Sequence, residues 1–103
     1  MTRTFKVKED VQQARTFQST TNGMPTEVKA VGVMLSDGRN TLYAEAYRER
    51  ADAVEQLRLM KGDLVLVQLS VIARRKTKDG VTYYSNCVSI DALQLLLRKR
   101  DQE

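Results

Sequence analysis

The fold is decided by residues 61–97, KGDLVLVQLSVIARRKTKDGVTYYSNCVSIDALQLLL. A turn signal, Lys61-Gly62-Asp63, opens an apolar run rich in β-branched residues, Leu64 to Ala73. A basic segment, residues 74–80, then leads into a second β-prone segment that carries Tyr83 and Tyr84. This pattern predicts a long β-hairpin with four basic side chains and one acid at its tip. Residues 91–97 are expected to leave the sheet as a turn followed by a short apolar strand or helix.

The residues before this hairpin change to a helical period. A helix is predicted over residues 48–60, with Ala53, Leu57 and Met60 on one face. We expect Arg48 and Asp52 to pair one turn apart. The helix is predicted to stop at Lys61-Gly62, because a basic last turn followed by glycine is a common helix end.

Three strands are predicted further upstream, over residues 11–17, 27–35 and 41–47. The cluster of turn formers at residues 18–25 predicts a loop, and Asp37-Gly38 predicts a tight hairpin turn. The third strand alternates cleanly, because its side chains point to opposite faces in turn. Its inward set is Leu42, Ala44 and Ala46, and its outward set is Tyr43, Glu45 and Tyr47.

One helix among antiparallel-looking strands, between the third and the fourth, is the element order of the OB-fold. The predicted fold class is therefore all-β, a five-stranded OB-fold Greek-key barrel with one helix between strands 3 and 4. A small α+β sandwich is the alternative. Residues 1–103 are expected to form one domain, with flexible ends at residues 1–8 and 98–103.

Composition limits the classes of function. The chain has 17 basic and 13 acidic residues, for a net charge of +4, which mildly favours an anionic partner. It contains no histidine and one cysteine, Cys87, so the usual zinc, copper and non-haem iron ligands and a Ser-His or Cys-His nucleophile are missing. We therefore expect no cofactor, no metal and no catalysis. The absence of a secretory signal or long apolar run, and the single cysteine, favour a cytoplasmic protein with no membrane association.

Several stretches also match a known family in their order and spacing. They are Ala44-Glu45-Ala46-Tyr47, Ala51-Asp52-Ala53, Lys61-Gly62-Asp63-Leu64-Val65-Leu66-Val67, Ala73-Arg74-Arg75-Lys76 and Tyr84-Ser85-Asn86-Cys87-Val88. Over residues 41–96 the chain resembles the core of bacterial single-stranded DNA-binding proteins and their small single-domain relatives. The resemblance implies an OB-fold that stacks bases on aromatic side chains.

By position, Tyr47 matches the family's aromatic residue at the end of the third strand, and Arg74 and Lys76 match its basic hairpin residues. Two family tryptophans correspond to Thr41 and Thr77, which cannot stack. The family's long acidic-tipped tail has no counterpart in this sequence. These departures favour an accessory or mobile-element protein, or a relative with a different ligand, over a general replicative role.

Candidate binding residues follow from the same pattern. Tyr43 and Tyr47 share a strand face with one residue of that face between them, and the two rings are expected to hold bases of one bound strand. Tyr83 is expected at the surface, whereas Tyr84 shares its parity with apparent core residues and is expected to be structural. Phe17 is expected to anchor the core rather than to stack. The full candidate set is Lys29, Arg39, Tyr43, Tyr47, Arg50, Arg74, Arg75, Lys76, Lys78 and Tyr83.

The residues favour a protein that binds single-stranded DNA with little sequence preference, by electrostatic capture and base stacking. RNA is a further candidate ligand, and a homodimer or homotetramer is expected because one small barrel offers a short site. The alternative is an OB-fold adaptor or oligomerisation module whose tyrosine face contacts protein. Glu45 is awkward in a DNA groove unless a cation neutralises it, because a carboxylate repels phosphate.

Overall fold

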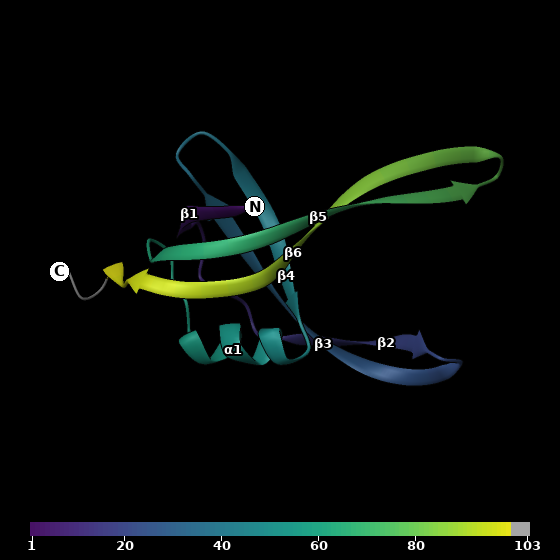
Figure 1. Ribbon diagram of the computed structural model, residues 1–103, viewed down its shortest axis with the longest axis horizontal. Coiled ribbons are helices and arrows are strands. Elements are labelled where there is room, and N and C mark those ends of the chain that lie inside the picture. The colour runs from purple at the N-terminus through teal and green to yellow at the C-terminus, as the bar shows by residue number, and fades with distance from the viewer. Residues whose placement is uncertain (100–103) are drawn as a thin grey trace.

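The computed structural model describes residues 1–99, including the backbone of Thr21, and is shown in Figure 1. It contains one helix and six strands within this range. In chain order they are β1 (Thr2–Val7), β2 (Arg15–Thr21), β3 (Met24–Ser36), β4 (Thr41–Tyr47), α1 (Glu49–Leu57), β5 (Leu64–Lys78) and β6 (Val81–Leu97). The protein is therefore mostly β with one helix between β4 and β5, which agrees with an OB-like fold. The described chain has six strands where five were predicted.

The strands pair in the order β1-β5-β6-β4-β3-β2, and β1 also pairs with β3. This additional pairing, Lys6 with Ser36 and Val7 with Leu35, joins the two ends of the series β1-β5-β6-β4-β3. β4 meets β6 through the parallel partners Glu45 and Ser89, whereas the other pairings are antiparallel. The pairings thus close into a ring of five strands. β2 pairs with β3 on the side opposite β4.

The N-terminal segment differs most from the prediction. Thr2–Val7 is a strand rather than a flexible end, and Phe5 and Val7 are buried in the core. The next strand begins at Arg15 rather than residue 11, and it continues to Thr21 through the predicted loop. Phe5 and Val7 explain the difference, because burying two apolar side chains on the same strand face stabilises pairing with β5. The extra strand also accounts for the count of six.

The inward alternation predicted for the third strand is confirmed. Ala44 and Ala46 are fully buried, and Leu42 packs against the core from a half-buried position. The core residues come from the inner faces of β1, β3, β4, β5 and β6 and from α1. They are Phe5, Val7, Val31, Val33, Leu35, Ala44, Ala46, Ala51, Val54, Leu59, Val65, Val67, Leu69 and Ile90.

The helix is shorter than predicted, and its predicted face is only partly buried: Leu57 packs against the core, whereas Ala53 and Met60 are exposed. It ends at Leu57, followed by Arg58 in the left-handed region (φ 49°), and its buried residues are Ala51 and Val54. The chain turns early because Leu59 is drawn into the core and its carbonyl accepts the Val11 N–H at 3.1 Å. Lys61-Gly62 therefore belongs to the turn before β5 and does not cap the helix.

Two hairpins extend beyond the ring and project toward the same end of the molecule, the right side of Figure 1. We call residues 71–88 the β5–β6 arm and residues 17–28 the β2–β3 arm. Side chains at 71–86 are exposed on both faces of the β5–β6 arm, since the pairing of β6 with β4 lies at Ser89. At its other end β6 stays in the sheet as far as Leu97, so the predicted departure of residues 91–97 is wrong.

The C-terminal end of the described chain is anchored. Arg98 donates from Nη2 to the Leu57 carbonyl at 2.6 Å, and its Nη1 lies 3.9 Å from the buried Asp63 carboxylate. The Lys99 N–H donates to the same carboxylate at 3.1 Å. The prediction of a flexible segment from residue 98 is therefore wrong for Arg98 and Lys99, and residues 100–103 lie outside the described range.

Candidate nucleic-acid interface

The outward face of β4 carries Tyr43, Glu45 and Tyr47, as the alternation predicts. Their partners on β3 are Met34, Gly32 and Ala30, so the face continues onto β3. Tyr43 is 51% exposed, and Tyr47 is half-buried. Two aromatic side chains thus lie on one surface strand with a carboxylate between them.

Tyr43 leans across the sheet onto a glycine. A Cβ built on Gly32 would lie 1.9 Å from the Tyr43 hydroxyl oxygen and 2.4 Å from Cζ, which is far inside van der Waals contact. Only glycine therefore leaves room for the ring in this position. The neighbouring strand holds the ring against the sheet while about half of the side chain remains exposed.

Tyr47 belongs to an aromatic pair with β2. Its ring and that of Phe17 meet edge to face, with centroids 6.3 Å apart and an interplanar angle of 84°. The Arg15 guanidinium lies 5.4 Å from the Phe17 centroid. Phe17 was expected to anchor the core, but its contacts place it on the outward face. This pairing fixes Tyr47 near the base of the β2–β3 arm.

Arg15 is the cation that neutralises Glu45. Its Nη2 lies 2.5 Å from Glu45 Oε2, and the Tyr47 hydroxyl donates to Glu45 Oε1 at 3.4 Å. Arg15 and Glu45 lie 30 residues apart and on strands separated by β3, so no local sequence signal connects them. Sequence reasoning missed Arg15 for this reason.

The pKa of Tyr43 is raised above its ordinary value. Burial of the phenol is the largest cause, and the nearby Glu45 carboxylate is the second. The same two causes come first in raising the pKa of Tyr47, with Cys87 acting in the same direction and the Arg74 guanidinium acting against them. Both phenols are therefore neutral at physiological pH. The Glu45–Ser89 pairing places the base of the β5–β6 arm beside this part of β4.

The register of the β5–β6 arm assigns its side chains to two faces. Lys76 is opposite Tyr83, and Arg75 is opposite Tyr84. Because cross-strand partners share a face and neighbours alternate, Arg74, Lys76 and Lys78 lie on the face of Tyr83. Ser89 has the same parity as Tyr83 and pairs with Glu45, so this face of the arm continues the outward face of β4. We call the combined surface the tyrosine face.

Tyr84 is not the structural residue that its parity predicts, because its side chain is 74% exposed. It does share a strand face with Ile90, which is buried in the core. That face loses its covering where the arm leaves the ring, so the same parity no longer leads to burial. Tyr84 and Arg75 lie together on the arm's second face.

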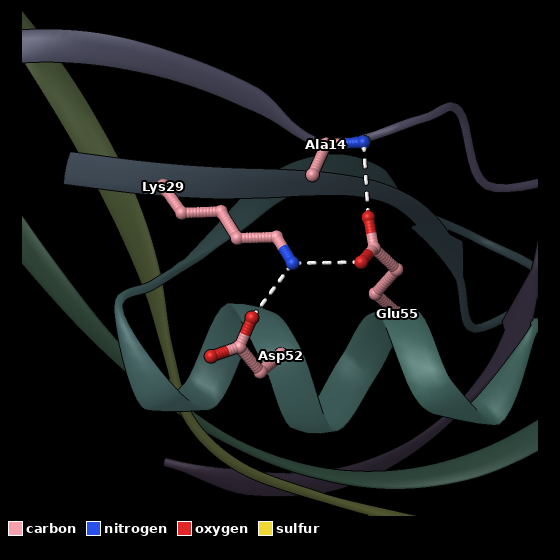
Figure 2. Close-up of polar contacts among 4 residues, drawn as sticks. All are labelled: Ala14, Lys29, Asp52 and Glu55. Atoms are coloured by element: carbon pink, nitrogen blue, oxygen red, sulfur yellow. Dashed lines mark hydrogen bonds and ion pairs between the residues drawn. The ribbon is translucent and has the colours of Figure 1, made fainter. Parts of the chain in front are cut away.

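Lys29 lies on the opposite side of the sheet, toward α1. Its Nζ donates to Asp52 at 2.6 Å and to Glu55 at 2.7 Å, and the other Glu55 oxygen accepts the Ala14 N–H at 3.4 Å (Figure 2). Hydrogen bonds to Asp52 and Glu55 raise the pKa of Lys29. Asp52 thus pairs with Lys29 rather than with Arg48.

Two other predicted cations also lie apart from the tyrosine face. Arg39 lies in the β3–β4 turn, where its backbone N–H donates to Asp37 at 2.9 Å, and Arg50 lies on α1. The structure thus brings together Tyr43, Tyr47, Tyr83, Arg74, Lys76 and Lys78. It places Arg75 on the arm's second face and leaves Lys29, Arg39 and Arg50 elsewhere.

A second basic region, which sequence reasoning missed, borders a cavity of about 860 Å³ beside β1. Four lysines line it, Lys6, Lys8, Lys61 and Lys99. Within residues 1–99 no group of three or more acidic or thiol side chains is placed to hold a metal ion. In the same range no helix combines the length and apolar character needed to cross a bilayer.

Of the comparisons with known proteins, the one with solved structures supports the fold. No family model matches the chain, and no curated protein matches it by sequence. Among solved structures, the small single-stranded DNA-binding protein from Streptomyces coelicolor is similar, with a TM-score of 0.51 and 19% sequence identity. The similarity covers 94% of this chain and 93% of that one. The two proteins therefore share their fold over nearly their whole lengths.

Proposed function

We propose that this protein binds single-stranded DNA through the tyrosine face and the β5–β6 arm, without catalysis. Arg74, Lys76 and Lys78 capture the phosphates, and Tyr43, Tyr47 and Tyr83 stack on the bases. Both interactions work on any base sequence, since every base has an aromatic face and every nucleotide a phosphate.

The observation that carries the proposal is the continuity of the tyrosine face. Exposed aromatic rings and unpaired cations share one side of β4 and the arm, through the Glu45–Ser89 bridge. Within the described residues, the ion pairs are formed by Arg3, Arg15, Lys29 and Arg98, so the arm cations remain available. A flexible anionic chain with flat bases complements such a surface.

The fold supports the same reading. We propose that the closed ring of strands is a five-stranded OB-fold Greek-key barrel, in which β1 and β2 together supply the first strand. In OB-folds the face of strands 2 and 3 and two hairpin loops bind oligonucleotides. β3, β4 and the two arms correspond to these parts. The similar Streptomyces protein is itself described as a single-stranded DNA-binding protein.

The test is fluorescence anisotropy with labelled oligo-dT over a range of salt concentrations. We expect binding at low salt and a steep loss of affinity at moderate salt, because captured phosphates release counterions. Duplex DNA and oligo-rU of equal length determine the preference for single strands and for DNA over RNA. An affinity for oligo-dT that barely responds to salt would contradict electrostatic capture.

A protein-contact role has one specific observation in its favour. Val71, Ile72 and Val81 are each more than half exposed on the β5–β6 arm, which has no packed layer behind it. Exposed apolar side chains are typical of contact surfaces, and Val71 lies on the arm's second face with Tyr84, away from the tyrosine face. We therefore propose a homodimer or homotetramer formed through the arm. Sedimentation equilibrium of Val71→Ser and wild type decides it: a smaller oligomer in the variant supports the arm contact, and an unchanged oligomer contradicts it.

A further inference from the structure

Glu45 lies at the centre of the tyrosine face. A carboxylate in this position does not help to bind phosphate, because the two negative charges repel each other. Its side chain is 18% exposed, so it is partly covered yet still open to solvent. Its β3 partner is Gly32, which has no side chain to cover it. Tyr43 and Tyr47 stand on either side, each two residues away on the same strand face. A base stacked on either ring therefore has its edge near Glu45.

The Glu45 carboxylate has acceptor capacity left. Arg15 occupies Oε2, and the Tyr47 hydroxyl makes a long contact of 3.4 Å with Oε1. An ionised carboxylate offers about four lone-pair sites, so further donors can be accepted on its open side. Arg15 offsets the negative charge without blocking both oxygens.

The surroundings of Tyr43 are also rich in acceptors. A hollow of about 150 Å³ opens beside its ring, and Glu9, Asp10, Gln12 and Gln13 contribute to its lining. Arg15 is the one cation among the lining residues, and its charge is already paired with Glu45. By contrast, the cations Arg74, Lys76 and Lys78 lie along the arm. Phosphates are attracted to the arm and repelled from the Tyr43 end. A bound strand therefore runs its backbone along the arm and turns its bases toward Glu45.

We infer that Glu45 is a specificity-determining residue that accepts a hydrogen bond from the exocyclic amino group of a stacked base. The inference rests on the proposed function and deepens it. Cytosine presents an N4 amino donor, whereas uracil and thymine present the O4 acceptor, which a carboxylate repels. A modest preference for cytosine over uracil and thymine is thus superimposed on capture that otherwise depends on phosphates and stacking.

The experiment compares oligo-dC with oligo-dU of equal length by anisotropy, at slightly alkaline pH where cytosine N3 is unprotonated. The two bases differ at position 4 and at N3, which is an acceptor in cytosine and an N–H donor in uracil, whereas stacking area and phosphate number are matched. We expect wild-type protein to bind oligo-dC about tenfold more tightly. In Glu45→Gln the ratio should fall to near one. Glu49→Gln, which removes one carboxylate from the exposed start of α1, should keep the wild-type ratio.

A second measurement requires no altered protein. Oligo-dC carrying two methyl groups on N4 has no amino donor, and wild-type protein should bind it no more tightly than oligo-dU. Equal wild-type affinities for oligo-dC and oligo-dU would overturn the inference, as would a preference that survives in Glu45→Gln. Absence of binding to every single strand at low salt would instead overturn the proposed function itself.

Discussion

Tyr47 is the central residue of the tyrosine face. Its ring packs against Phe17, its hydroxyl donates to Glu45, and the Arg74 charge acts on it. Phe17 lies on β2, Arg74 on β5 and Glu45 on β4 itself, so the ring lies at the junction of β4 with both arms. A ring held in advance loses little conformational freedom when a base stacks on it. Tyr43 is held in a comparable way, by the space above Gly32.

We predict that Tyr47→Ala weakens oligo-dT binding by about 1–3 kcal/mol, because one stacking platform is lost. Tyr47→Phe, which keeps the ring and removes the hydroxyl, should retain most of the affinity. Anisotropy at fixed low salt measures both, and urea unfolding checks that the variants remain folded. Equal affinities for Tyr47→Ala and wild type would remove Tyr47 from the binding surface.

Gly32→Ala should destabilise the fold by about 1–3 kcal/mol, because the added methyl group overlaps the Tyr43 ring. The measurement is the free energy of unfolding in urea. The matched control is the same substitution in a Tyr43→Ala background, where the obstructing ring is gone and most of the cost should disappear. An equal cost in both backgrounds would mean that the Tyr43 ring is not the obstacle.

At the scale of elements, the β5–β6 arm combines a long ladder with almost no burial. The whole strands β5 and β6 are 15 and 17 residues long. Their ladder extends into the arm, well past the pairing of β6 with β4 at Ser89. A two-stranded hairpin without a packed face is only marginally stable in water. Its shape is thus set by the half of β5 and β6 that lies in the ring, while its side chains remain free to meet a ligand.

Lys76→Ala should reduce the slope of log affinity against log salt by about 0.7, the value for one phosphate contact on a single strand. Affinity should fall for all sequences alike, since a phosphate contact carries no base information. Arg50→Ala is the matched control, because it also removes one cation but lies on α1, away from the tyrosine face. An unchanged slope in Lys76→Ala, or the same loss in both variants, would place the phosphates elsewhere.

At the scale of the whole molecule, the ring is closed by contacts between distant segments. Asp63 is 2% exposed and connects two of them, the turn after α1 and the end of β6. It accepts the Met60 N–H at 2.9 Å and the Lys99 N–H at 3.1 Å, and it faces the Arg98 guanidinium. This carboxylate therefore fastens the end of β6 to the turn that follows α1.

We predict that Asp63→Ala lowers the free energy of unfolding by about 3 kcal/mol, because the partly buried Arg98 loses its counter-charge and the N–H groups of Met60 and Lys99 lose their acceptor. Arg3→Ala is the comparison: it breaks the exposed Arg3–Asp37 pair, which spans 3.6 Å, and should cost about 1 kcal/mol or less. Urea unfolding of both variants provides the measurement. Similar small losses in the two would show that Asp63 does not fasten the chain.

The sequence by itself determined the mostly β class, the position of the helix, the long basic hairpin and the alternation of β4. These features depend on the spacing of apolar side chains, every two residues in a strand and every 3.6 in a helix, which can be read from residues close together in the sequence. Reasoning from neighbouring residues failed where contacts between distant segments decide whether a strand forms or a side chain is buried. It missed the strand that Phe5 and Val7 stabilise by burial, and it gave Tyr84 a core position that the uncovered arm does not provide.

Only the tertiary structure decided which predicted side chains share a surface. Lys29 is turned to α1 by Asp52 and Glu55, while Arg15, a residue with no local signal, neutralises Glu45. Strand pairing determines such neighbours, because residues far apart in the chain become adjacent once the register is set. Sequence patterns therefore identified the tyrosines and arm cations one by one, and the closing of the ring placed them on one face.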